Sequence, residues 1–223
     1  MARVGVIRLE PSRMKALRAR LGHDDTPRVY NDRFLVRELF WRRLDALLAL
    51  SEAPSRERVL DFGGGNGVLT PTLSRLYREV VCVDLRTEMA EEIARSERLA
   101  NVTARPGDIA SLGLPDGHFD TIIAADVLEH IIDLDALAGQ FKRLLKPGGQ
   151  LLVSAPSENR FYELGRRIFG YTKPDDHYHA ASFVEETLAR HLPLAQRRYF
   201  PANVSLLAVF SLARFVKAEE ASP

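Results

Sequence analysis

The sequence lacks the features that mark disulfide-linked, membrane-spanning or nucleic-acid-binding chains. Its 223 residues include one cysteine, Cys82, so no internal disulfide can form and a zinc site built from several thiolates is excluded. No apolar run reaches the roughly 18 residues of a membrane span, and residues 1–10 lack the apolar core of a signal peptide. Lys and Arg number 31 against 30 Asp and Glu, without the basic excess of a nucleic-acid binder. We therefore expect a cytoplasmic globular protein with no nucleic-acid partner.

The near-zero net charge conceals an uneven distribution along the chain. Residues 1–58 carry 13 basic and 8 acidic side chains, residues 59–155 carry 9 and 14, and residues 156–223 carry 9 and 8. The middle third is therefore acidic, and an acidic site favours a ligand that carries positive charge.

Short apolar runs alternate with helical patterns through the middle of the chain. The predicted strands are 58–62, 79–84, 102–105, 119–125 and 150–155, and the predicted helices between them are 68–77, 87–99 and 134–145. This alternation predicts an α/β fold, a Rossmann-like three-layer sandwich around a mainly parallel sheet. Ligands bind such sheets at the carboxyl ends of the strands, near the point where the strand order reverses.

The flanking regions predict three further helices and a pair of strands. Helices are expected at 12–22, from Ser12 to Gly22, and within 30–51. The first would pack on the domain or form a flexible arm, and the alternative is that it touches a membrane surface peripherally. A third is expected at 182–191, with a capping box from Ser182 to Glu185. Residues 194–200 and 206–215 are predicted to close the sheet as an antiparallel pair, although the second is also compatible with a buried helix. The expected organisation is a helical cap and substrate region at 1–54, a cofactor-binding core at 55–156, a lid insert at 157–181, and a final helix and strands at 182–223.

A glycine loop follows the first predicted strand and carries the strongest functional signal. It comprises Asp61, Gly63, Gly64, Gly65, Asn66 and Gly67. The spacing is G-x-G-x-G, and a dinucleotide fingerprint would need glycine where Val68 stands. Glycines permit a sharp turn and a close approach of the backbone to a ligand. Asp61 would repel a pyrophosphate, but it suits a ligand with an ammonium and a sulfonium group.

The next two predicted strands also end in acidic residues. Asp84, followed by Leu85, stands where a carboxylate can accept hydrogen bonds from ribose hydroxyls. Asp108 and Ile109 follow the third strand, where an adenine amino group and ring would lie. The alternative is that each acid only caps a loop, ends a strand or forms a turn.

Taken together, these motifs resemble those of class I S-adenosylmethionine-dependent methyltransferases. The matching segments are Asp61 to Gly67, Asp84, Asp108 with Ile109, Phe119 to His130, and Lys146 to Gly149, over roughly residues 55–156. The resemblance implies a seven-stranded sheet whose last strand is antiparallel, S-adenosylmethionine as cofactor and S-adenosylhomocysteine as product. It also adds Ala125 and Asp126 to the cofactor-binding residues. The segment 126–130 is most similar to the small-molecule branch that includes ubiquinone and menaquinone biosynthesis enzymes.

Asp126, Glu129 and His130 share one helical face in this segment. They could hold a divalent metal. We favour the alternative, a helix start with Asp126 as N-cap, Glu129 closing a capping box and His130 lining the pocket. No metal site is therefore predicted.

The remaining candidates concern catalysis and the acceptor. A base is needed only for a protonated acceptor; His130, His177 and His179 are the candidates, and the alternative is a surface histidine cluster. Aromatic side chains suggest a small apolar or aromatic acceptor, although Phe34 and Trp41 are expected to pack on the core; the set is Tyr30, Phe34, Trp41, Phe161, Tyr162, Phe169, Tyr171 and Tyr178. Two other functions stay open, a methyltransferase that acts on protein or RNA and a non-catalytic cofactor-binding module.

Overall fold

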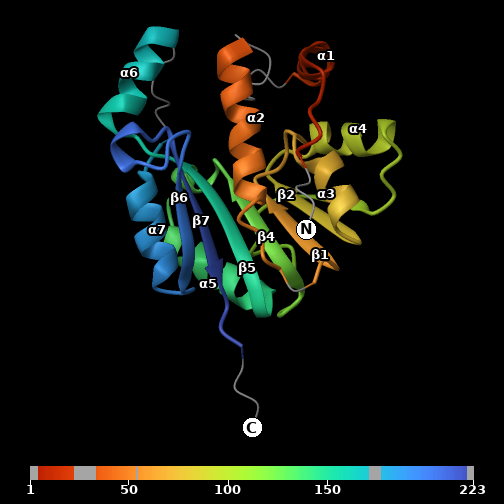
Figure 1. Cartoon of the computed structure of the whole chain (residues 1–223). Coiled ribbons are helices and arrows are strands. Elements are labelled where there is room, and N and C mark those ends of the chain that lie inside the picture. The colour runs from red at the N-terminus through yellow and green to blue at the C-terminus, as the bar shows by residue number, and fades with distance from the viewer. Residues whose placement is uncertain (1–4, 23–33, 54, 171–176, 220–223) are drawn as a thin grey trace.

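A seven-stranded sheet forms the centre of the chain in a computed structural model, which describes residues 5–22, 34–53, 55–170 and 177–219 (Figure 1). The strands are β1 (Arg58–Phe62), β2 (Glu79–Asp84), β3 (Val102–Pro106), β4 (Phe119–Ala125), β5 (Leu145–Pro156), β6 (Leu194–Phe200) and β7 (Phe210–Val216). Their order is β3-β2-β1-β4-β5-β7-β6. The pairs from β3 to β5 are parallel, and β7 is antiparallel to both β5 and β6. The predicted fold with its antiparallel last strand is therefore confirmed, and the helical alternative for residues 206–215 is wrong.

Helices cover both faces of this sheet. One face carries α1 (Pro11–Leu21), α2 (Phe34–Leu48), α3 (Thr70–Leu76) and α4 (Glu88–Ser96), and the other carries α5 (Leu134–Leu144) and α7 (Ala181–Ala189). Three further elements lie beyond the strand ends: α6 (Arg160–Phe169) and the 3₁₀ helices η2 (Leu128–His130) and η3 (Ser205–Leu207). Alternate strand residues enter opposite cores, as Val59 and Leu60 do on β1. Both faces are therefore buried, as a largely parallel sheet requires.

The strand order reverses between β1 and β4. From β1 the chain continues outward to β2 and β3, whereas β4 returns to the other side of β1 and is followed by β5. A crevice at the carboxyl ends of neighbouring strands is expected at such a point. The loop after β1 and the loop after β4 both begin there.

The first helix packs on the domain through its apolar side. Met14 and Leu17 are buried, and Leu21 packs against the same core. Arg13 and Arg20 form ion pairs with Glu97 and Glu92 at 2.6 Å. The predicted packing of this helix on the domain is confirmed. Among the helices in the described ranges, none is long and apolar enough to cross a membrane.

Two predicted helix starts are wrong. α1 begins at Pro11 with Glu10 as N-cap, one residue before Ser12, and ends as predicted at Gly22, which has φ 67°. α7 begins after Ala180 without a side-chain cap, so the predicted capping box does not form. Its Glu185 is buried and accepts hydrogen bonds from Arg197 and Ser211 of the neighbouring strands. Glu185 therefore binds two residues distant in the sequence and does not cap its own helix.

Asp120 links three strands at the opposite end of the sheet. It is 4% exposed, and its carboxylate accepts hydrogen bonds from the Arg58 backbone N–H and from Lys146 Nζ, each at 2.7 Å. Burial alone would raise the pKa of Asp120, but these hydrogen bonds and the Lys146 charge hold it below its usual value. Lys146 therefore stabilises the sheet through its ion pair with Asp120. Strand β5 begins earlier than predicted, because Leu145 already pairs with Phe119.

We expect Asp120→Asn to lower the free energy of unfolding by about 1–3 kcal/mol at pH 7, the cost of losing hydrogen bonds to a charged group. Because the pKa of Asp120 is lower in the folded state, its contribution is present above the unfolded pKa and is lost as the pH falls. The loss in the variant should therefore shrink in acid. Urea denaturation at several pH values measures it. Asp116→Asn, which removes an exposed pair with Arg143, is the control and should change little.

Candidate active site

A glycine loop leads directly from β1 into the crevice. The backbone N–H of Gly63 donates to Val83 O at 2.8 Å, which extends the pairing of β1 with β2. Gly63 has φ 76°, and a Cβ at this position would lie 2.5 Å from Val127 Cγ2 in the loop after β4. Only glycine fits here, because both the backbone conformation and the space exclude a side chain. The loop after β1 is therefore packed tightly against the loop after β4.

Asp61 lies beneath this loop as an unsatisfied carboxylate. Its side chain is 3% exposed, and Oδ2 has no hydrogen-bond partner among the described residues. A Cβ at Gly64 would lie 2.2 Å from the same oxygen, so the loop can pass over Asp61 only as glycine. Burial, and to a lesser degree the charge of Asp84, raises the pKa of Asp61 to about 7. The site favours a proton or a cationic group beside this carboxylate.

Asp84 joins the end of β2 to the glycine loop. Its Oδ2 accepts a hydrogen bond from the Gly65 N–H at 2.9 Å, and Oδ1 accepts one from the Arg86 N–H at 3.1 Å. Each carboxylate oxygen can accept a further hydrogen bond. Leu85 is 78% exposed beside it, and Asn66 turns the loop by accepting from the Val68 N–H at 3.1 Å.

Asp108 and Ile109 lie next to Asp84 because the Gly107 N–H donates to Asp84 O at 2.9 Å. Asp108 is exposed, and its Oδ1 accepts from the Ala110 N–H at 2.8 Å, which forms a turn. Ile109 is 4% exposed and packs into the core on the α5 face. The structure thus brings the three predicted strand ends together.

Ala125 and Asp126 follow β4, but Asp126 is not a helix cap. It has φ 54°, its carboxylate forms an ion pair with Arg43, and Oδ1 accepts from Ser154 Oγ at 2.9 Å. The helical turn that follows is the short η2, whose N-cap is Val127. The predicted capping box is therefore wrong. Ala125 lines a small cavity together with Asp61, Gly63, Gly64 and Arg43.

Sequence reasoning missed Arg43. This α2 residue is 2% exposed, and its guanidinium lies 5.0 Å from the Phe40 ring centroid and 4.8 Å from that of Phe210. The signal was present, because Arg43 follows Val36 and Phe40 and precedes Leu47 at the spacing of a buried helix face. An arginine at such a position indicates a buried anion nearby.

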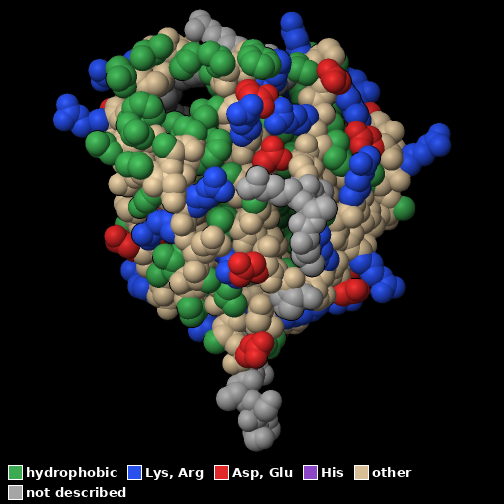
Figure 2. All heavy atoms as spheres, viewed as in Figure 1, with side chains coloured by type: hydrophobic (Ala, Val, Ile, Leu, Met, Phe, Trp, Pro, Cys, Tyr) green, Lys and Arg blue, Asp and Glu red, His purple; other side chains and the backbone are tan. Residues whose placement is uncertain are grey.

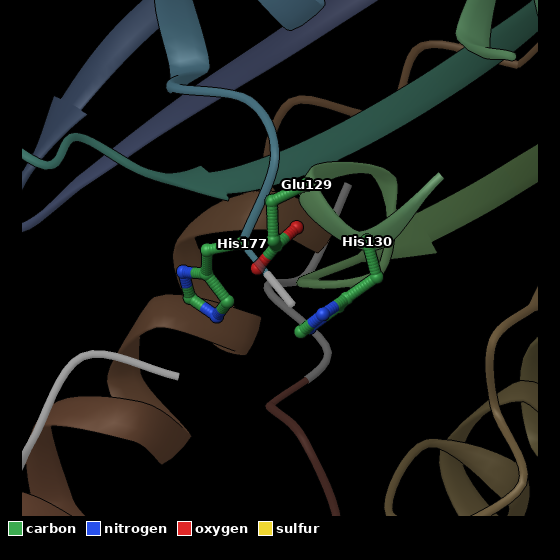
Figure 3. A group of neighbouring side chains, drawn as sticks. All are labelled: Glu129, His130 and His177. Carbon is green, nitrogen blue, oxygen red and sulfur yellow. The ribbon is translucent and has the colours of Figure 1, made fainter. Parts of the chain in front are cut away.

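Glu129, His130 and His177 form a second group at the same end of the sheet (Figure 3). One ligand atom from each lies within 4.8 Å of the other two. The rings of His130 and His177 meet edge to face at 4.7 Å, and His177 Nδ1 lies 2.8 Å from Glu158 Oε1. The His177 side chain is 8% exposed. The side chain of His177 therefore faces this group and little of it reaches the surface.

His179 lies outside this group. Its Nε2 is 3.0 Å from Ile131 O, and its ring stacks on Phe183 with centroids 4.4 Å apart. The backbone N–H groups of Tyr178 and His179 both donate to Glu129 O, at 2.8 and 3.3 Å. His179 therefore helps to attach the segment before α7 to the loop after β4.

The aromatic candidates divide between core and surface. Trp41 is buried as predicted, but Phe34 is 63% exposed, so its predicted core packing is wrong. Tyr30 and Tyr171 lie outside the described residues. Apolar side chains gather at the end of the molecule that carries α6, η3 and the start of α2 (Figure 2); the most exposed are Phe34, Leu35, Leu164, Ile168 and Leu206.

Comparisons with known proteins agree with this geometry. Residues 32–196 match the family model described as a methyltransferase domain. The chain is 35% identical over 138 residues to the ubiquinone/menaquinone biosynthesis C-methyltransferase UbiE of Shewanella sp. (strain ANA-3), covering 58% of this chain and 53% of that protein. It is 38% identical over 130 residues to UbiE of Pseudomonas aeruginosa (strain LESB58), covering 53% and 50%. The chain thus spans about half the length of these curated relatives.

A solved structure shows the same fold. The N-methyltransferase NodS from Bradyrhizobium japonicum, in complex with S-adenosylhomocysteine, matches with a TM-score of 0.67 and 23% identity, over 92% of this chain and 98% of that one. The predicted family, with S-adenosylmethionine as its cofactor, is confirmed by the family match and the curated relatives. The chain belongs to the methyltransferase-domain family.

Proposed function

We propose that this chain transfers the sulfonium methyl of S-adenosylmethionine to an oxygen, nitrogen or carbon nucleophile of a small, apolar or aromatic molecule. One observation carries the proposal: Asp61 is a buried carboxylate with an unpartnered oxygen, and Gly64 passes over it where a Cβ would collide. A carboxylate in that position fits the ammonium group of the cofactor's amino-acid part. S-adenosylmethionine supplies an activated methyl group when it is bound.

The residues around Asp61 support the rest of the cofactor site. We assign Gly63 to Gly67 to the close approach of the backbone, and Asp84 to the ribose hydroxyls, for which its oxygens keep free acceptor capacity. Asp108, Ile109 and Leu85 would border the adenine, and Ala125 would lie beside the amino-acid part. Asp126 contributes indirectly in this assignment, because its carboxylate holds Arg43 at the same cavity.

The acceptor is proposed to approach from the side of α2 and α6. The exposed apolar side chains of these helices surround that end of the sheet (Figure 2), and apolar walls suit an apolar acceptor. The protein's part in the transfer is to align the nucleophile with the methyl group and to exclude water. The curated relatives are named for quinone biosynthesis, which supports an aromatic acceptor. A catalytic role for His130, His177 or His179 stays a prediction.

Charge pairing argues against the nucleic-acid alternative. The basic excess of the first 58 residues is offset by ion pairs that Arg8, Arg13 and Arg20 form with acidic residues, and Arg43 is buried in another. Paired cations attract phosphate groups less strongly than free ones.

The direct test is methyl transfer with S-adenosylmethionine that carries a labelled methyl group. We expect label to appear in apolar small molecules of a metabolite extract, including quinol precursors, and not in RNA or protein. Cofactor binding without transfer to any fraction would show a non-catalytic module. Salt-sensitive transfer to RNA would show the nucleic-acid alternative.

Asp61→Asn should change cofactor binding and folding stability in opposite directions. With a pKa raised from 3.8 to about 7, the folded protein keeps a proton that the unfolded chain has lost between about pH 4 and pH 7, so the stability of the wild type falls as the pH rises through this range. The variant has no carboxyl group to titrate here, so its stability should not fall in this way. At pH 8 it should be more stable than the wild type by on the order of 2–4 kcal/mol. It should also lose detectable cofactor binding. Urea denaturation at pH 5 and pH 8 and calorimetric titration measure the two effects.

Gly64→Ala should weaken cofactor binding by about tenfold or more. The added methyl group would collide with Asp61 Oδ2, so the loop would have to move, at a cost of about 1–3 kcal/mol. Gly139→Ala is the matched control: its Cβ meets nothing within 4 Å on helix α5. The control should bind the cofactor normally and keep or gain stability. Equal binding by both variants would contradict the loop assignment.

A further inference from the structure

Three side chains from two distant segments converge beside the loop after β4. Glu129 and His130 belong to η2, and His177 belongs to the segment before α7 (Figure 3). The Glu129 carboxylate lies between the two imidazole rings in this view. One carboxylate oxygen and two ring nitrogens lie within 4.8 Å of one another. Metal–donor distances of about 2.0–2.2 Å allow donors up to about 4 Å apart, so small side-chain rotations complete a coordination site.

The two segments are held together independently of these three side chains. Backbone N–H groups of Tyr178 and His179 donate to Glu129 O, and the His179 ring reaches Ile131 O. The donors are therefore positioned by main-chain attachment before any ion binds. Prepositioned donors lose little conformational entropy on binding.

A second observation points to a ligand in this group. Glu129 is 2% exposed, and its Oε2 has no hydrogen-bond partner among the described residues. A buried carboxylate oxygen without a partner is costly. A cation bound between this carboxylate and the two imidazoles would compensate the buried charge.

The surroundings of His177 resemble those of a metal ligand. Its Nδ1 lies 2.8 Å from Glu158 Oε1. Metal-bound histidines usually have their second nitrogen hydrogen-bonded to a carboxylate or carbonyl, which orients the ring and raises its basicity. Asp126, in contrast, is already paired with Arg43 and Ser154. The ligand set therefore differs from the one considered from sequence, with His177 in place of Asp126.

We propose that Glu129, His130 and His177 bind one divalent transition-metal ion, with Glu158 orienting His177. Two imidazoles and one carboxylate favour manganese, iron, cobalt or zinc over magnesium and calcium, which prefer oxygen ligands. Three protein ligands leave coordination positions open. As metal ligands, His130 and His177 would not act as free bases, so the metal site and the general-base role are alternatives for these two residues.

The test is metal binding by the chelator-treated full chain. Titration with Co²⁺ should show one ion per chain and visible absorption bands that indicate nitrogen ligands, and Zn²⁺ should raise the melting temperature. Mg²⁺ should bind much more weakly. Glu158→Gln should weaken Co²⁺ binding by about 10- to 100-fold, and His177→Ala by more. His118→Ala, a histidine outside the group, is the control and should bind Co²⁺ as the wild type does.

Two results would overturn the proposal: Co²⁺ binding no stronger than Mg²⁺ binding, or Co²⁺ spectra unchanged in both Glu158→Gln and His177→Ala. The Glu158→Gln variant keeps the three ligands, so it remains informative if His177→Ala does not fold. Asp61→Asn separates this proposal from the methyltransferase function. It should lose cofactor binding and keep the Co²⁺ spectrum, so failure of one does not imply failure of the other.

Discussion

A buried, unpaired carboxylate is the constraint around which the site is built. Asp61 lies near the carboxyl end of a strand whose last four residues are buried, and the loop that follows covers it so closely that Gly64 cannot carry a side chain. Burial raises the pKa of Asp61 to about 7, so the folded protein bears a cost that a cationic ligand removes. The same loop is tied to β2 through Asp84 and is packed on Val127 after β4. The ends of β1, β2 and β4 are therefore fixed relative to one another by this loop.

A second buried charge extends this arrangement to the helical layer. Arg43 reaches from α2 to Asp126 and lies against the rings of Phe40 and Phe210. The N-terminal helix is therefore connected electrostatically to the end of β4, and not only through apolar packing. A buried ion pair that loses one partner leaves the other uncompensated, so the position of α2 and the conformation of the loop after β4 depend on each other.

The sequence predicted the features that arise locally and missed those that depend on distant partners. Strand alternation and the glycine loop follow from neighbouring residues, and the order of strands follows from general rules of parallel sheets. The two capping boxes were wrong because Asp126 pairs with Arg43 and Glu185 pairs with Arg197, contacts that only the folded chain creates. The approach of His177 to Glu129 depends on backbone hydrogen bonds across 49 positions, from Tyr178 to Glu129. No local pattern could reveal it.

The attachment of the segment before α7 to the loop after β4 has an evolutionary consequence. It uses the main-chain N–H groups of residues 178 and 179, which every residue except proline possesses. The side chain at position 178 is 54% exposed and takes no part in that hydrogen bond. Substitutions at position 178 can therefore accumulate while His177 keeps its place. The surface around position 178 can vary in evolution, because the backbone hydrogen bonds to Glu129 O stay unchanged.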